Sequence, residues 1–245
     1  VGLPAASMVA VTLAFGFKLQ AGKDLAKSKD KAEKAAANAR LGRKDGTWTF
    51  ALGTDAGYSA FSVTVKKGKG KLAGTLPDGT KVSLSAQGVL GDTALAIPFM
   101  YSKKSSLGFV FWVFDDGKVL VSDFTALRQP DGMSLKVTQK AVSVTHRLAD
   151  GAHVFETPFF GQAFEVEGRK WNFPKQQKKL GDADPNPFGT KLTFTEKTGV
   201  VKGSFTVLDP TGRKQKYTVN GVVVGDVMYG SALLKKVGSV ECSAQ

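Results

Sequence analysis

Apolar and polar side chains alternate along most of this chain, and a period of two residues is typical of β-strands that bury one face. The alternation is clearest in residues 199–234, where Val201, Phe205 and Val207 fall on one side and Lys202 and Thr206 on the other. Residues that favour turns interrupt this stretch twice. The pattern therefore predicts three antiparallel strands joined by two turns.

The same arrangement occurs earlier in the chain, in residues 70–97. Trp171 and Phe173 stand before the second copy as Trp48 and Phe50 stand before the first. Because these features follow in the same order, they favour a duplicated module whose copies superpose glycine on glycine. The matching spacings are those of Gly70 and Gly74 with Gly199 and Gly203, and those of Gly79 and Gly88 with Gly212 and Gly221.

The fold class expected from this pattern is all-β, with two tandem, related, antiparallel β-meander modules and one short N-terminal helix or linker. Each module is a sandwich or a small barrel. We expect an N-terminal strand and helix or linker in 1–45, the first module in 46–128, connecting strands in 129–168 and the second module in 169–245. Gly221 interrupts a β-branched strand, which predicts a bulge or a close backbone approach.

The N-terminal region has two parts. Residues Met8–Leu19 alternate like one strand, and their apolar run is too short for a transmembrane segment. Residues 23–41 are rich in Lys and Ala and predict a solvated or frayed linker helix, with Asp24 at its start and Gly42 as a left-handed stop. A basic arm that binds polyanions is the alternative. Because the chain begins with Val1, we expect a processed product or a fragment.

The composition is that of a folded β-protein with a strong positive charge. Of 245 residues, 42% are hydrophobic and 28 are glycine, which argues against disorder and for many short strands and turns. Lys and Arg number 34 against 21 Asp and Glu, and the net charge of +13 attracts polyanions of any kind. A single cysteine, Cys242, excludes an internal disulfide and leaves the compartment open.

Few residues suggest catalysis. His146 and His153 flank Asp150 and could hold a metal or act as a base if the loop folded back, but Asp150-Gly151 is an ordinary hairpin turn. The sequence has no Gly-x-Ser-x-Gly elbow, phosphate-binding loop or dinucleotide fingerprint. We therefore expect no catalytic residues, no cofactor and no enzymatic activity.

A proline-rich loop offers a metal site as an alternative. Asp182, Asp184 and Asn186 alternate like the first oxygen ligands of a calcium loop. Pro187 stands where an EF-hand requires glycine, and Thr193 stands where it requires glutamate, so that class of site is excluded. An irregular calcium site and a rigid loop without metal stay open as alternatives.

Lysines at predicted turns are the remaining candidates for a binding surface. They could prevent strand edges from pairing and keep the protein soluble. Alternatively, they could bind an acidic glycan, a lipid headgroup or nucleic acid. Similar lysine pairs occur in both copies, so we expect them to gather on one side, with Lys197 and Lys202 beside the last pair as a second patch. The candidates are Lys66, Lys67, Lys69, Lys71, Lys103, Lys104, Lys235 and Lys236.

Three short motifs carry a family resemblance: Lys202-Gly-Ser-Phe-Thr, Asn220-Gly-Val-Val-Val and Tyr229-Gly-Ser-Ala. Together with Gly2-Leu3-Pro4, which looks like a turn motif of the same repeats, they resemble the C-terminal β-region of very large secreted bacterial proteins with immunoglobulin-like repeats. The resemblance covers residues 46–245, and the Lys/Ala-rich segment departs from it. It implies an extracellular structural or adhesive role and supplies no catalytic residues.

The function expected from the sequence is that of a non-catalytic structural or adhesive protein, secreted or on a bacterial cell surface. Its partners would be further copies of itself or neighbouring chains of a surface assembly. The alternative is a module that binds acidic polysaccharide, with no specific nucleic-acid partner, and an enzyme with an unrecognised site is the third possibility. Steeply salt-dependent binding would favour the module, whereas strand edges buried against another chain would favour the structural subunit.

Overall fold

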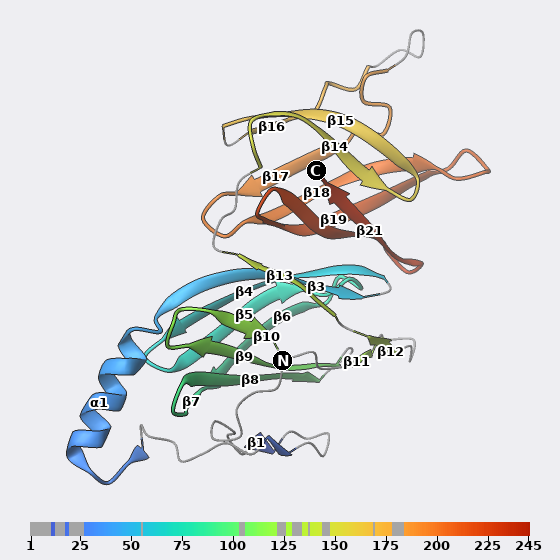
Figure 1. The fold of residues 1–245 in the computed structure, drawn as a ribbon. Helices are drawn as coiled ribbons and strands as arrows, with labels where there is room; N and C mark the ends of the chain where they lie inside the picture. Colours follow the sequence, from blue (N-terminus) through green and yellow to red (C-terminus); the bar gives the residue numbers. More distant parts are fainter. Residues whose placement is uncertain are drawn as a thin grey trace. The chain divides into compact units, whose positions relative to one another are not determined.

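The computed structural model describes residues 27–54, 56–102, 106–121, 126–128, 134–136, 138–143, 148–168, 170–177 and 184–245, with two short strands at 11–12 and 18–19. Strand accounts for 62% and helix for 7%, and the sheets are antiparallel. These proportions confirm the expected all-β class with one helix in the described residues (Figure 1). None of the described helical structure is long and apolar enough to cross a membrane.

The described elements are one helix and a series of strands. The helix is α1 (Lys31–Gly42), preceded by β1 (Val11–Thr12) and β2 (Lys18–Leu19). The next strands are β3 (Gly46–Thr54), β4 (Gly57–Lys66), β5 (Lys69–Thr75), β6 (Lys81–Gln87), β7 (Val89–Leu90), β8 (Ala94–Ser102), β9 (Ser106–Phe114), β10 (Val119–Val121), β11 (Ala126–Arg128), β12 (Ser134–Lys136) and β13 (Thr138–Ser143). The last are β14 (Gly151–Thr157), β15 (Phe160–Glu167), β16 (Lys170–Asn172), β17 (Lys191–Thr195), β18 (Val200–Leu208), β19 (Lys214–Val224), β20 (Val227–Leu234) and β21 (Gly238–Ala244).

Strands β14 to β21 form one nearly closed eight-stranded sheet in the order β16-β15-β14-β21-β20-β19-β18-β17 (Figure 1). The three strands expected in residues 199–234 are β18, β19 and β20, and they pair in chain order. Phe155, Phe205 and Val219 lie in the core of this sheet and are at most 1% exposed. Alternate polar residues face outward, because burying each large apolar side chain contributes roughly 1.5–3 kcal/mol.

Strands β3 to β10 and β13 form a five-stranded sheet, β13-β3-β4-β5-β6, and a four-stranded sheet, β10-β9-β8-β7. One bent segment belongs to both sheets, since β6 ends at Gln87 and β7 begins at Val89. A Cβ atom on Gly88, between them, would lie 2.7 Å from Leu95 Cδ1 and 2.9 Å from the Gly68 oxygen, so only glycine fits this bend. With β6 and β7 taken as one strand, β4 to β9 repeat the strand order of β17 to β21.

Two glycines of the expected repeat have matching surroundings. A Cβ atom on Gly74 would lie 2.3 Å from the Ala60 oxygen of the preceding strand. A Cβ atom on Gly203 would lie 2.0 Å from the Lys191 oxygen, again in the preceding strand. In both copies glycine permits the second strand of a hairpin to approach the first closely.

The other glycine pair does not fit the same superposition. Gly221 lies opposite Val201, which is two residues before Gly203. In the first copy the Gly88 amide donates to the oxygen of Gly68, which is six residues before the corresponding glycine of β5. When Gly74 is superposed on Gly203, Gly88 therefore does not fall on Gly221, and the expectation that both pairs superpose is wrong. The reason is that β18 and β19 continue further past Gly203 than the strands of the first copy continue past Gly74.

The chain divides into two compact units that are not continuous in sequence. One consists of Val1–Thr47, Val63–Ala73 and Val82–Gln139, and the other of Trp48–Ser62, Gly74–Lys81 and Lys140–Gln245. Within the second unit, the outward sides of β3 and β4 pack against β19 and β20, through Ala51, Tyr58, Ala60, Val222, Val224 and Tyr229. The module boundaries expected from the sequence stay a prediction, and β14 and β15, expected as connecting strands, lie in the eight-stranded sheet.

Helix α1 begins later than the sequence suggests. Its first residue is Lys31, and Asp30 caps it by accepting hydrogen bonds from the amides of Ala32 and Glu33 at 2.7 and 2.9 Å. The expected cap, Asp24, lies outside the described residues. The long Lys/Ala-rich segment therefore contains a shorter helix, which Asp30 caps.

The end of α1 also differs from the expectation. Gly42 is the last helical residue rather than a left-handed stop, and Arg43 follows it with a φ of −73°. Ala37 and Leu41 are buried on the side of the helix that faces the protein. The helix is therefore attached to its unit and is not a solvated linker.

The N-terminal segment is a hairpin and not one strand. Val11 lies opposite Leu19 and Thr12 opposite Lys18, so β1 and β2 pair with each other. The sequence predicts a single strand at Met8–Leu19, and both β1 and β2 lie within that range. The prediction of one strand is therefore wrong.

Candidate functional site

Exposed lysines lie on one side of the strands β4, β5 and β6. Along β5, Lys69 and Lys71 are exposed whereas Gly70 and Leu72 are buried, and Lys66 is exposed at the end of β4. Strand β6 contributes exposed Ser and Gln side chains. We call Lys66, Lys69 and Lys71 the first lysine face.

A second group of lysines lies on the outer side of β17, β18 and β19. Lys202 stands between Thr193 and Asn220 in one cross-strand row. Lys191 is in the next row, opposite Ser204. The exposed lysines of these three strands, which we call the second lysine face, are Lys191, Lys202, Lys214 and Lys216.

The strands that carry the two lysine faces contain no Asp or Glu. Asp209 lies in the turn after β18, where it accepts hydrogen bonds from Thr211, Arg213 and Gln215. These bonds, first those of the Thr211 hydroxyl and the Gln215 amide, lower the pKa of Asp209 to about 2. None of the seven lysines forms an ion pair with another described residue. Their charges are therefore free to meet a ligand.

Several of the lysines expected from the sequence lie at this site. Lys66, Lys69 and Lys71 are exposed on the first lysine face. Lys67 is in the turn between β4 and β5 with a φ of 48°, and its amide donates to an Asp45 carboxylate oxygen at 2.7 Å. Lys67 therefore shapes the hairpin that holds its neighbours.

The lysines of the second expected patch do not lie together. Lys235 and Lys236 are exposed in the turn between β20 and β21, and Lys197 is in the turn between β17 and β18. Successive turns of a meander alternate between its two ends, so Lys197 lies at the end opposite to Lys235 and Lys236. The expected patch is wrong for this reason. Lys103 and Lys104 lie outside the described residues.

Lys191 of the second lysine face was not singled out from the sequence, whereas Lys214 and Lys216 stand out there beside Arg213 as basic residues at a predicted turn. All three lie within strands, and a search for lysines at turns passes over Lys191. The signal was the lack of Asp and Glu in strands that alternate lysine with core residues. That signal becomes a surface only when the strand register is known.

The proline-rich loop is held by a buried side chain. Asn186 is 3% exposed, and its side-chain oxygen accepts hydrogen bonds from Gln162 Nε2 at 2.6 Å and the Thr190 amide at 2.8 Å. Its side-chain nitrogen donates to the oxygens of Pro174 and Thr190 at 2.9 and 3.0 Å. With every polar atom of this side chain occupied by protein, the structure favours a rigid loop.

The other calcium candidates give no support to a metal site. Asp184 accepts hydrogen bonds from the amides of Gln177 and Asn186 at 3.2 and 2.9 Å. Asp182 lies outside the described residues. Within the described ranges no three His, Cys, Asp or Glu side chains are placed to hold a metal ion.

The described part of the histidine segment leads into β14, which begins at Gly151, so Asp150 and Gly151 do not form the expected hairpin turn. His153 Nε2 lies 2.6 Å from the Ala149 oxygen, and Asp150 accepts a hydrogen bond from the Gly168 amide at 3.0 Å. His146 lies outside the described residues. His153 and Asp150 therefore serve the hairpin of β14 and β15.

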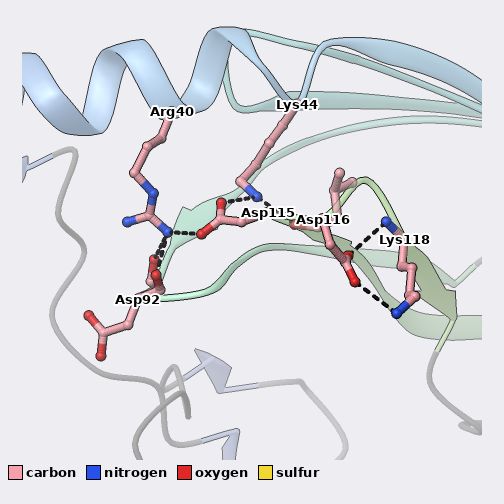
Figure 2. Close-up of polar contacts among 8 residues, drawn as sticks. Arg40, Lys44, Asp92, Asp115, Asp116 and Lys118 are labelled. Carbon is pink, nitrogen blue, oxygen red and sulfur yellow. Dashed lines mark hydrogen bonds and ion pairs between the residues drawn. The ribbon is translucent and has the colours of Figure 1, made fainter.

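A cluster of charges joins the end of α1 to the hairpin of β9 and β10 (Figure 2). Arg40 donates to Asp115 Oδ2 at 2.8 Å and to the Gly91 oxygen at 3.1 Å. Lys44, which is 2% exposed, places its Nζ 2.7 Å from Asp115 Oδ1 and donates to the Val113 oxygen at 3.0 Å. Two cations thus share one carboxylate.

This cluster is a clamp for the helix. Burial acts to raise the pKa of Asp115, but hydrogen bonds from Lys44 and Arg40 and their positive charges outweigh it and hold the pKa below 3.8. The ammonium group of Lys44 is taken up by Asp115 and a backbone oxygen, so it is not free to react. Burial likewise raises the pKa of the Cys242 thiol, which stays protonated inside the eight-stranded sheet.

Comparison of the chain with protein-family models, with curated proteins and with solved structures found no match.

Proposed function

We propose that this chain is a non-catalytic adhesive or structural protein that binds acidic polysaccharide through the two lysine faces. The observation that carries the proposal is the composition of β4 to β6 and β17 to β19, which expose lysine, hydroxyl and amide groups and contain no carboxylate. A place outside a bacterial cell belongs to the proposal and is supported by the resemblance of the motifs at Lys202, Asn220 and Tyr229.

Both faces suit an extended anionic polymer. Residues two apart on a strand are about 7 Å apart on the same side, which is the relation of Lys69 to Lys71 and of Lys214 to Lys216. Each ammonium group is a point charge on a flexible stem, and it can follow carboxylates or sulfates along a chain. Neighbouring groups such as the Thr193 hydroxyl and the Asn220 amide can bond sugar hydroxyls.

Protection of strand edges accounts at most for Lys191, which lies on β17 at the end of the strand order. Lys202 lies on β18, which is paired on both sides by β17 and β19. Lys216 lies on β19, which is paired on both sides by β18 and β20. A lysine inside a sheet leaves the edges as they are. Solubility is the competing explanation, and it predicts no ligand.

The test is a titration of the full chain with a sulfated glycan, a uronic-acid glycan and a neutral glycan at low and physiological salt. We expect binding of both acidic glycans that weakens as salt rises, and none of the neutral one, because ammonium groups release counterions from the polymer. A variant with Lys66, Lys69 and Lys71 changed to Gln, and one with Lys191, Lys202 and Lys216 changed to Gln, should each bind more weakly.

A matched control removes the same charge elsewhere. Lys31, Lys34 and Arg43 are exposed on or next to α1, and changing them to Gln should leave binding close to that of wild type. Equal losses in the control and in both lysine-face variants would reduce the effect to net charge and overturn the proposal. Stronger binding of double-stranded DNA than of either acidic glycan would assign the faces to another polymer.

A further inference from the structure

The outer side of β14 and β15 carries the opposite charge to the second lysine face. Glu156, Glu165 and Glu167 are exposed there, and we call them the glutamate face. No Lys or Arg occurs in residues 148–168. The eight-stranded sheet thus has an acidic and a basic side.

The residues between the glutamates of this face have small side chains. Val154 pairs with Ala163 at its centre, Glu156 lies opposite Gly161, and Glu165 lies opposite Ala152. Val154 is 41% exposed although it is apolar. Small residues between the glutamates leave room for the long stems of lysines from another surface, and exposed Val154 offers an apolar contact to those stems.

Two of the three glutamates, Glu156 and Glu165, have no basic residue opposite them on the described strands. None of the three forms an ion pair with a described residue, and only Glu167 has a basic cross-strand neighbour, Lys170. The glutamate face therefore keeps its charge for a partner.

One molecule cannot bring its own two faces together. Strands β21 and β20 separate β14 from β19 on one side, and β16 separates β15 from β17 on the other. Because the sheet is nearly closed, the two faces point to different sides (Figure 1). A contact between them must join two molecules.

We propose that the partner of the glutamate face is a second copy of this chain, which binds with its second lysine face. Charge complementarity and relief both support this occupant, since lysines project from one surface and small residues lie between glutamates on the other. The contact is heterologous and leaves a free face of each kind at the ends, so it can continue into a linear assembly. It goes beyond the proposed glycan binding, because the glutamate face has no part in that function.

The test is sedimentation velocity of the full chain over a range of concentrations at low and high salt. We expect wild type to form species larger than a monomer at low salt and to dissociate as salt screens the contact. Wild type that stays monomeric at low salt up to the highest soluble concentration would overturn the inference.

Charge reversal identifies the surfaces. One variant has Glu156, Glu165 and Glu167 changed to Lys, and the other has Lys191, Lys202 and Lys216 changed to Glu. Each alone should self-associate at least about tenfold more weakly, since three charge pairs become repulsive. A mixture of the two should associate again, because each variant offers what the other lacks. Failure of the mixture, with both variants folded by circular dichroism, would contradict the proposed contact.

Milder changes guard against misfolding, and a matched control separates this inference from the proposed function. Glu165→Gln and Lys202→Gln should each weaken self-association, and unchanged association in both would count against it. Changing Lys66, Lys69 and Lys71 to Glu alters the charge as much as either reversal and should leave self-association intact. The glutamate-face variant should still bind acidic glycan, so loss of one property does not entail loss of the other.

Discussion

Gly221 and Gly230 lie opposite each other on β19 and β20, where neither strand has room for a side chain. A Cβ atom on Gly221 would be 2.8 Å from the Tyr229 oxygen, and one on Gly230 would be 2.7 Å from the Asn220 oxygen. The pairing is regular on both sides of Gly221. Of the two alternatives expected at Gly221, the close backbone approach is confirmed and the bulge is not.

Gly221→Val should therefore destabilise the protein. The added atoms have no space between β19 and its neighbour, and overpacking of this kind costs about 1–3 kcal/mol. Urea unfolding would measure the loss in the free energy of unfolding. Gly161→Ala is the matched control, because a Cβ atom there meets only Val154 Cγ1 at an ordinary 3.5 Å. Equal stability of Gly221→Val and wild type would show that the approach is not as close as described.

Asn186→Ala should also destabilise the protein. The change leaves Gln162 and the Thr190 amide without their buried acceptor, at a cost of about 1–3 kcal/mol. Thermal unfolding of this variant and of Asn172→Ala, whose side chain is exposed on β16, would compare a buried and an exposed amide. If both variants melt like wild type, the loop does not depend on Asn186.

Residues differ in how far the sequence reveals them. Gly221 could be singled out because it interrupts a run of β-branched residues. The role of Asn186 could not, because its partners Gln162 and Thr190 come together only after β15 and the loop have folded. A polar residue in a Pro-rich segment looks the same as a metal ligand until its hydrogen bonds are known.

At the scale of elements, α1 depends on contacts that its own sequence does not contain. Local composition predicted a helix in this segment, but Asp30 rather than Asp24 caps the part that the structure describes. Its attachment relies on Asp115, which lies far along the chain. A face made mostly of alanine could not reveal this attachment.

Asp115→Asn should loosen α1 at neutral pH. Lys44 would keep its buried charge with only neutral acceptors, the Asn side-chain oxygen and the Val113 oxygen, in place of a carboxylate. Because Asp115 is 47% exposed, we expect a modest loss of about 1–2 kcal/mol. Urea unfolding followed by circular dichroism would measure it. Asp116→Asn is the control, since Asp116 pairs with Lys118 in an exposed position and should matter little.

The effect of Asp115 should depend on pH. Its pKa in the folded protein is below the ordinary 3.8, so the ionised carboxylate adds stability at all pH values above about 4. That stability shrinks as the pH falls below 3.8, where the unfolded chain takes up the proton first, and it is gone once the carboxylate is protonated in the folded protein as well. The difference between wild type and Asp115→Asn should therefore shrink at about pH 3. A difference that persists unchanged there would show that the charge of Asp115 is not what holds α1.

For the whole molecule, the period of two residues was sufficient to predict the fold class and the meander of β18, β19 and β20. It could not predict that β14 and β15 close the eight-stranded sheet, because non-local pairing leaves no mark in alternation. The hairpin of β1 and β2 was missed for the same reason, since alternation is the same on both sides of a turn. Glycine spacing was a poor guide to register, because hairpins of different length share it.

The distribution of charge, too, could be predicted from the sequence only in part. The lack of acidic residues in β17 to β19 and of basic residues in residues 148–168 can be read from the sequence. Only the strand order shows that these two groups of strands lie at different places around one nearly closed sheet. The net charge of +13 does not show that one side of the eight-stranded sheet is acidic. The charges have to be assigned to strands before that side can be recognised.

The central claim is that the two lysine faces bind acidic polysaccharide, and the salt dependence of that binding tests it most directly. The affinity for one sulfated glycan would be measured at several salt concentrations for wild type and for the variant with Lys191, Lys202 and Lys216 changed to Gln. Each lysine that meets the polymer contributes to the slope of log affinity against log salt, by about 0.7–0.9 if sulfated glycan releases counterions as nucleic acids do. We predict a steep slope for wild type and one shallower by about two in the variant. Equal slopes, or no binding by wild type at low salt, would contradict the claim.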